Sequence, residues 1–236
     1  IVTDAKGTAN LTIGGANLTI TSIDASASLG TLVLDTLAVA AAMDITTGAG
    51  TNSITTEVGL ADAISLGSAS GTDTYNLTAD NAAIAAADTI ANFQAGAGGD
   101  VISITASAID GATSGELENS AGTAMSAAFS VNFQTDADGT FTQSGTDNIY
   151  VVTDTIADST ALIAAVSTNV TSAGAMGDNE DQLFLYTNGT DTILARVEIN
   201  GAVSTAASLT FDGAEDLVVL TGVLITDLTE ANFVFV

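Results

Sequence analysis

The sequence predicts a mainly β protein, in which a degenerate parallel β-roll or β-solenoid is followed by a β-sandwich-like C-terminal unit with a few short helices. Short β-prone segments recur along the chain and are separated by Gly, Ser, Asn and Asp, which are turn residues. Within these segments about every second residue is apolar, as in strands that bury one face. In addition, 47% of the residues are hydrophobic and the mean hydropathy is +0.45, so the chain can bury a sizeable core.

The first region, residues 1–105, is expected to form the coils of the solenoid. Its strand-like segments are short, and each coil of a solenoid buries its apolar face only against the neighbouring coils. The spacing is irregular, so the repeat is degenerate, and by periodicity alone a β-sandwich fits equally well. The expected strands are residues 11–13, 18–20, 32–34, 52–55, 64–66 and 74–77.

Two short helices and a boundary interrupt the strand pattern. The Ala-rich residues 78–91 could form a helix with Asp80 near its start, and residues 158–166 could form a second one. Residues 105–127 are rich in Ala, Gly and Ser and predict a loop-rich boundary. The second region, residues 106–236, includes most of this boundary and is expected to form a β-rich assembly or secretion region. Its strands are expected at 128–133, 148–152, 182–186, 192–199, 217–220 and 232–236.

The charge balance excludes several classes of partner. The chain has 28 acidic residues but only two basic ones, Lys6 and Arg196, which gives a formal net charge of −26. Nucleic acid and bare anionic membranes would be repelled. The apolar runs are shorter than the roughly 20 residues that span a bilayer, so no membrane insertion is expected. Self-repulsion must be relieved by salt, by protonation or by bound divalent cations.

The missing residue types argue against an enzyme. There is no Cys and no His, which removes disulfides, the usual zinc sites and the Ser-His and Cys-His nucleophilic pairs. Carboxylates remain as the plausible proton-transfer groups, but nothing singles out one pair among the 28 acids. We therefore expect no catalytic residues and no organic cofactor.

One motif stands out: a glycine, a spacer, an Asp or Asn, a spacer and then an apolar residue. Glycine permits a tight positive-φ turn that aims carbonyl oxygens at one point, and aspartate adds a hard anionic oxygen, which together suit Ca²⁺. The same residues also form ordinary β-turns without metal, and both interpretations stay open. The motif occurs at Gly50-Thr51-Asn52, Gly71-Thr72-Asp73, Gly98-Gly99-Asp100, Gly145-Thr146-Asp147 and Gly189-Thr190-Asp191.

A separate acidic loop offers one more candidate calcium site. Asp136-Ala137-Asp138-Gly139 could place two carboxylates on one ion, and it fits a hairpin turn equally well.

These turns resemble worn copies of the glycine- and aspartate-rich nonapeptide of RTX proteins, at residues 47–55, 68–76 and 95–103. Residues 88–93 and 99–104 are similar to the segment that joins RTX coils to the terminal region. The apolar residues 217–223 and 232–236 resemble the ending that a type I exporter recognises. Taken together, the chain most resembles the C-terminal part of RTX-type bacterial surface-layer proteins.

The resemblance implies a calcium-dependent structural protein of the bacterial cell surface. After type I secretion it would self-assemble outside the cell into a lattice or filament, so its main partner is itself. Cell-surface polysaccharide could be bound through regions outside this chain. The start at Ile1, without Met or a signal-peptide pattern, suggests a processed product or fragment. Two alternatives stay open: the non-catalytic C-terminal RTX secretion domain of an exported protease or lipase, and an RTX adhesin.

Overall fold

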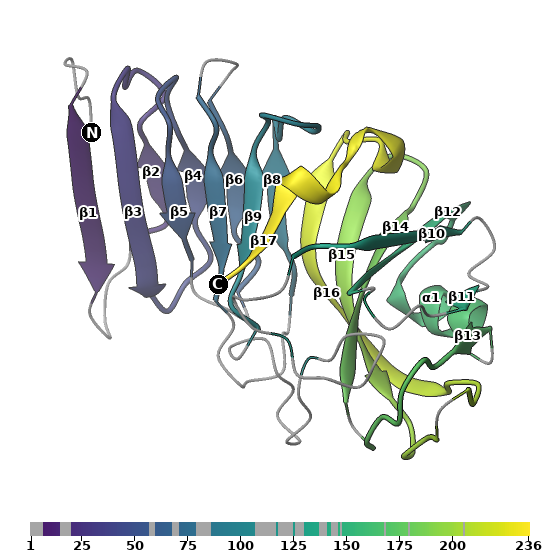
Figure 1. Ribbon diagram of the computed structural model, residues 1–236. Coiled ribbons are helices and arrows are strands. Elements are labelled where there is room, and N and C mark those ends of the chain that lie inside the picture. The colour runs from purple at the N-terminus through teal and green to yellow at the C-terminus, as the bar shows by residue number, and fades with distance from the viewer. Residues whose placement is uncertain are drawn as a thin grey trace.

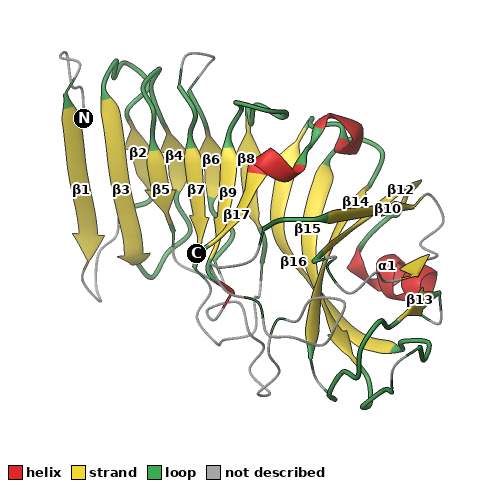
Figure 2. Ribbon diagram, in the orientation of Figure 1, coloured by secondary structure: helices red, strands yellow, loops and turns green. Residues whose placement is uncertain are grey.

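The computed structural model describes residues 7–14, 20–56, 60–67, 71–78, 86–106, 117, 125, 130–136, 141–142, 146, 148–167, 169–178, 180–204 and 206–236. In these residues the chain is mainly β and contains parallel sheets, as predicted. Helices are few and short (Figure 2): α1 (Ser159–Val166) and the 3₁₀ turns η2 (Ile225–Asp227) and η3 (Glu230–Asn232). None of the described helices is long and apolar enough to cross a membrane.

The strands of the first region alternate between two sheets, and those of each sheet lie side by side in parallel (Figure 1). We call one strand of each sheet, with the two turns that connect them, a coil. A six-stranded sheet holds β1 (Thr8–Gly14), β3 (Thr31–Ala38), β5 (Ser53–Thr55), β7 (Thr74–Leu77) and β9 (Val101–Ile104). A nine-stranded sheet holds β2 (Ser22–Asp24), β4 (Asp44–Thr46), β6 (Ala63–Ser65) and β8 (Asp88–Ala91).

Buried apolar side chains stack in register from coil to coil. Successive strands align residue for residue, so the inward-facing position of each strand lies on that of the next. Each of these side chains contributes about 1.5–3 kcal/mol when fully buried, which explains why such short strands suffice. The stacked residues are Leu34, Ile54, Tyr75 and Ile102 in one sheet and Ile23, Ile45, Ile64 and Ile90 in the other.

The C-terminal residues return to the parallel strands of the first region and form the last coil. The end of β16 (Phe211–Thr221) pairs in parallel with β8, and β17 (Phe233–Phe235) pairs in parallel with β9, with Phe233 opposite Ile102. Figure 1 shows β17, in yellow, beside β9. The region that begins at residue 106 therefore shares both sheets with the region that precedes it.

The rest of the second region extends the nine-stranded sheet. Its strands are β10 (Phe133–Asp136), β12 (Ile149–Thr155), β14 (Asp181–Thr187) and β15 (Thr192–Ile199), and a small sheet pairs β11 (Phe141–Thr142) with β13 (Val170–Thr171). β10, β12 and β14 are parallel, whereas β14–β15 and β15–β16 are antiparallel. One face of this sheet continues the first core, and the other face carries a second core. The rings of Phe141, Tyr150 and Phe184 pack there with centroids 5.0–6.2 Å apart.

The two helix predictions have different outcomes. The helix at 158–166 is confirmed: Asp158 caps α1, and its Oδ1 accepts a hydrogen bond from the Ala161 N–H at 2.8 Å. The helix at 78–91 is wrong at its C-terminal end, because Asp88–Ala91 is strand β8 and Ile90 is buried in register with Ile64. Residues 79–85 lie outside the described residues, as does most of the boundary expected at 105–127.

Candidate functional site

Three of the predicted Gly-x-Asx turns stack on one another. Each lies where the chain passes from the nine-stranded into the six-stranded sheet, before β5, β7 and β9. The strands that follow are in register through Ser53, Thr74 and Val101, so the preceding residues align as well. We call Asn52, Asp73 and Asp100 the first Asx column; all three are buried.

Each side chain of the first Asx column accepts a hydrogen bond from the backbone of the preceding coil. The Leu32 N–H donates to Asn52 Oδ1 at 3.1 Å, and the Asn52 N–H donates to Asp73 Oδ1 at 2.7 Å. The Asp73 N–H donates in turn to Asp100 Oδ1 at 2.8 Å, while Asp100 Oδ2 accepts from the Gln94 N–H at 2.8 Å. The column thus links adjacent coils by hydrogen bonds additional to those between the strands. It also gives acceptors to buried N–H groups, which would destabilise the fold if they were left unpaired.

The glycines of these turns serve two different purposes. A Cβ on Gly50 would lie 2.2 Å from the Gly30 carbonyl oxygen, and one on Gly71 would lie 2.7 Å from the Thr51 nitrogen. Neither glycine has a positive φ, so the expected positive-φ turn is wrong there: the glycines are needed because successive turns stack backbone on backbone. Gly98 does adopt a positive φ, of 82°.

Asparagine amides occupy two positions among backbone oxygens. The Nδ2 group of Asn52 donates to the Gly48 and Gly50 carbonyl oxygens at 3.1 and 2.7 Å and to Asp73 Oδ1 at 2.9 Å. In the last coil, Nδ2 of Asn232 donates to the Asp100 carbonyl oxygen at 2.8 Å, among other acceptors. The Asn52 NH₂ group thus contacts three oxygen atoms of the turn by hydrogen bonding, although it brings no positive charge.

The same hydrogen bond, from a backbone N–H to an Asx side chain, recurs in the second region, one residue after the position that the motif predicts. The Asn132 N–H donates to Asn148 Oδ1 at 2.8 Å, and both asparagines directly precede a strand, β10 and β12. Gly145 and Asp147 of the predicted motif lie outside the described residues. Among the described residues of this turn, Asn148 makes the contact to the neighbouring strand's first turn.

A second column, which the sequence reasoning missed, lies on the opposite turns. The Met43 N–H donates to Asp62 Oδ1 at 2.7 Å, and the Asp62 N–H donates to Asp88 Oδ1 at 2.8 Å. Asp88 Oδ2 also accepts from the hydroxyls of Thr56, at 2.7 Å, and Tyr75. We call Asp62 and Asp88 the second Asx column. Neither residue has a glycine two positions before it, but both stand two positions before a buried isoleucine, and that signal could have found them.

Burial perturbs the carboxyl groups of both columns. Burial, reinforced by the charge of Asp100, raises the pKa of Asp73 from 3.8 to about 6, although hydrogen bonds from Asn52 act in the opposite direction. Burial also raises the pKa of Asp100 and of Asp88. These groups favour folding most below about pH 4, and that contribution is lost as the pH rises through the raised pKa values.

The remaining predicted turn sites lie away from the first Asx column. Gly189-Thr190-Asp191 forms the hairpin between β14 and β15, in which Gly189 has a φ of 94°. Asp191 Oδ1 accepts from the Gly222 N–H at 2.9 Å, so it fastens this hairpin to the last coil. Asp136 ends β10, and Asp138 lies outside the described residues.

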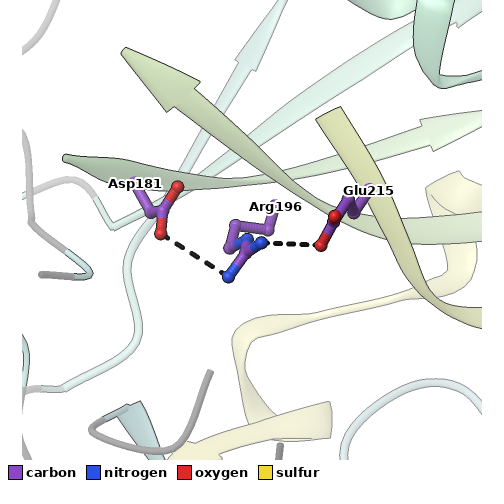
Figure 3. Close-up of polar contacts among 3 residues, drawn as sticks. All are labelled: Asp181, Arg196 and Glu215. Atoms are coloured by element: carbon purple, nitrogen blue, oxygen red, sulfur yellow. Dashed lines mark hydrogen bonds and ion pairs between the residues drawn. The ribbon is translucent and has the colours of Figure 1, made fainter. Parts of the chain in front are cut away.

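One of the two basic residues is buried among acids in the second region (Figure 3). The guanidinium of Arg196, on β15, lies 2.6 Å from Glu215 Oε2 and 3.7 Å from Asp181 Oδ2. Burial, together with the nearby charge of Asp212, raises the pKa of Glu198, while Arg196 lowers it. Arg196 thus offsets part of the negative charge of Asp181 and Glu215 within the fold.

Within the described ranges, no three acidic side chains converge as a metal-ligating group. Calcium binding at the predicted turns stays a prediction, and the column oxygens named above already accept N–H donors. Comparisons of the chain with protein-family models, with curated proteins and with solved structures gave no match.

Proposed function

We propose that the chain is a non-catalytic structural module of a bacterial surface layer or extracellular filament, which self-assembles outside the cell with the help of calcium. In this proposal the stacked coils are a degenerate β-roll. The observation that carries it is the alignment of Asn52, Asp73 and Asp100 at equivalent turns of successive coils. Aligned turns support a repeat architecture, and stacked repeats form extended surfaces.

Calcium has an electrostatic role in the proposal. A net charge of −26 opposes both compaction and contact between copies, and bound divalent ions would relieve that repulsion. A site with a dissociation constant of about 10⁻⁴ M, facing about 10⁻³ M calcium, adds roughly 1.4 kcal/mol, so a few sites are enough to shift the balance. We expect the Asp73 and Asp100 turns to contribute more than the Asn52 turn, where an amide already contacts three oxygens.

The test combines calcium content with circular dichroism of the purified chain before and after chelation at moderate salt. We expect bound calcium and a loss of β signal or of assembly when it is removed. An unchanged spectrum and intact assemblies after complete chelation would contradict the calcium part of the proposal.

Electron microscopy with calcium separates the proposal from its alternatives. Ordered sheets or fibres are expected for a surface-layer or filament module. Dispersed monomers would favour a secretion domain of an exported protease or lipase, or an adhesin.

A further inference from the structure

The chain contains two Asn-Gly pairs, Asn188-Gly189 and Asn200-Gly201, and each follows a strand of the second region. An asparagine in such a pair can lose its side-chain amide, because the backbone nitrogen of the next residue can attack the side-chain carbonyl carbon. Glycine favours this attack because it has no Cβ to obstruct it. The sequence gives both pairs the same chemistry, whereas the structure places them in different surroundings.

At Asn188 the hairpin holds both ends of the side-chain amide. Its Oδ1 accepts from the Thr190 N–H at 2.9 Å and from the Asp191 N–H at 2.8 Å, and its Nδ2 donates to Asp191 Oδ2 at 3.3 Å. The N–H of the attacking residue, Gly189, donates to the hydroxyl of Thr187 at 3.1 Å. These hydrogen bonds must break before the nitrogen can attack, so the hairpin protects Asn188.

At Asn200 the backbone is held but the side chain is free to rotate. The Asn200 N–H donates to the Thr210 carbonyl oxygen at 2.8 Å, and the Asn200 carbonyl oxygen accepts from the Thr210 hydroxyl at 2.9 Å. Asn200 is exposed, and none of the residues that the structure describes hydrogen-bonds its side-chain amide. The amide can therefore turn toward the Gly201 nitrogen without losing a contact.

A carboxylate contacts the nitrogen that would attack Asn200. The Gly201 N–H donates to Asp178 Oδ1 at 2.6 Å, a short hydrogen bond to an acidic side chain. A carboxylate in this position draws the proton away from the nitrogen and can accept it while the new bond forms. The corresponding acceptor for Gly189 is the neutral hydroxyl of Thr187, which is a far weaker base.

We propose that Asn200 is a site of spontaneous deamidation, with Asp178 as the general base. The Gly201 nitrogen bonds to Cγ of Asn200 and passes its proton to Asp178. The bond between Cγ and Nδ2 then breaks, and the Nδ2 group takes that proton and leaves as ammonia. Water opens the resulting cyclic imide at either carbonyl carbon, which leaves aspartate or isoaspartate at position 200. The reaction consumes water and releases ammonia, and it needs no other reactant.

The product should loosen the end of the β15–β16 pairing. Ile199, the residue before the site, pairs with Phe211, and isoaspartate would add one methylene to the backbone directly after it. The new carboxylate would also lie two residues after Glu198, whose pKa is already raised by burial and by the charge of Asp212. Deamidation would thus act as a slow, irreversible timer on this part of the fold. The inference goes beyond the proposed function and does not depend on it.

Peptide mapping by mass spectrometry tests the site in the full-length chain. The protein is incubated at neutral pH, folded or in urea, and fragment spectra assign the mass gain of deamidation to each asparagine over time. In urea the two Asn-Gly pairs should react at similar rates. In the folded chain Asn200 should react at least about tenfold faster than Asn188, because the Asn188 amide must first break its hydrogen bonds. Equal rates in the folded chain, or a faster reaction at Asn188, overturn the proposal.

A matched pair of substitutions tests the general base. Asp178→Asn keeps an oxygen for the Gly201 N–H but removes the carboxylate, and it should slow the reaction at Asn200 at least about tenfold. Glu180→Gln removes one negative charge from the same part of the chain and should leave that rate unchanged. Asn188 serves as the internal control, because a variant that loosened the fold would accelerate its reaction as well. An unchanged rate in Asp178→Asn, or an equal slowing in both variants, contradicts the role of Asp178.

Discussion

Asp73→Asn should stabilise the protein near neutral pH, although it replaces a buried hydrogen-bonded carboxylate. In the wild type, Asp73 Oδ1 accepts from the backbone and side-chain nitrogens of Asn52 at 2.7 and 2.9 Å. An asparagine keeps that acceptor, and its own NH₂ group can reach the Gly71 carbonyl oxygen, as Asn52 reaches that of Gly50 at 2.7 Å. What the substitution removes is the cost of holding a buried charge.

The magnitude follows from the pKa of Asp73. A rise from 3.8 to about 6 corresponds, at about 1.36 kcal/mol for each pH unit, to a ceiling of about 3 kcal/mol. Halving that ceiling for residual solvation and screening at the turn gives about 1.5 kcal/mol. Because the folded-state pKa is the higher one, the wild type loses this amount as the pH rises from about 4 to about 6. Asp73→Asn should recover it at pH 7.5 and should differ little from the wild type at pH 4.

Urea unfolding at pH 4, 5 and 7.5 in the presence of a chelator measures the effect. Asp73→Ala deprives the buried Asn52 N–H of its acceptor and should cost about 1–3 kcal/mol at every pH. Asp44→Asn removes one negative charge at an exposed position and controls for net charge. If Asp73→Asn destabilises the protein as much as Asp73→Ala does at pH 7.5, the charge itself is required and the reasoning is refuted.

Three further substitutions test other contacts, each by the free energy of unfolding at pH 7.5. Gly50→Ala should cost about 1–3 kcal/mol, because the added Cβ would lie 2.2 Å from the Gly30 carbonyl oxygen; a neutral result would contradict the stacking of turns. Arg196→Met should cost about 3 kcal/mol, because it leaves the buried Asp181 and the partly exposed Glu215 without their cation; a more stable variant would show that the ion pairs are dispensable. Phe233→Ala should cost about 3–5 kcal/mol by uncovering the last coil, whereas Val234→Ala, at a side chain 41% exposed, should cost little.

The local patterns in the sequence predicted the local structure well. Alternating apolar residues indicated β1, β3, β5, β6 and β7, and the Gly-x-Asx motif identified three turns that the fold stacks in one column. The helix at residues 158–166 was also predictable, because Asp158 stands at its start as a cap. These features depend on neighbours in the sequence, which periodicity and turn chemistry report directly.

The long-range features were not predictable in the same way. β17 pairs with β9 although about 130 residues separate them, and no short motif encodes that choice. Asp62 and Asp88 act through donors in a neighbouring coil, and without the Gly-x-Asx spacing they look like ordinary surface acids in the sequence. Nothing in the sequence indicates a partner for Arg196. The antiparallel pairing of β15 with β14 and β16 places it between Asp181 and Glu215.

Amide hydrogen exchange, resolved by residue, tests the bridging of coils by the first Asx column most directly. Leu32 is the second residue of β3, and Asn52 and Asp73 directly precede β5 and β7. The N–H group of each donates to a side chain of the next coil. We expect them to exchange as slowly as the central strand amides, and Asp73→Ala should selectively accelerate exchange at Asn52. Exchange of these three amides at the rate of an unprotected chain would contradict the account.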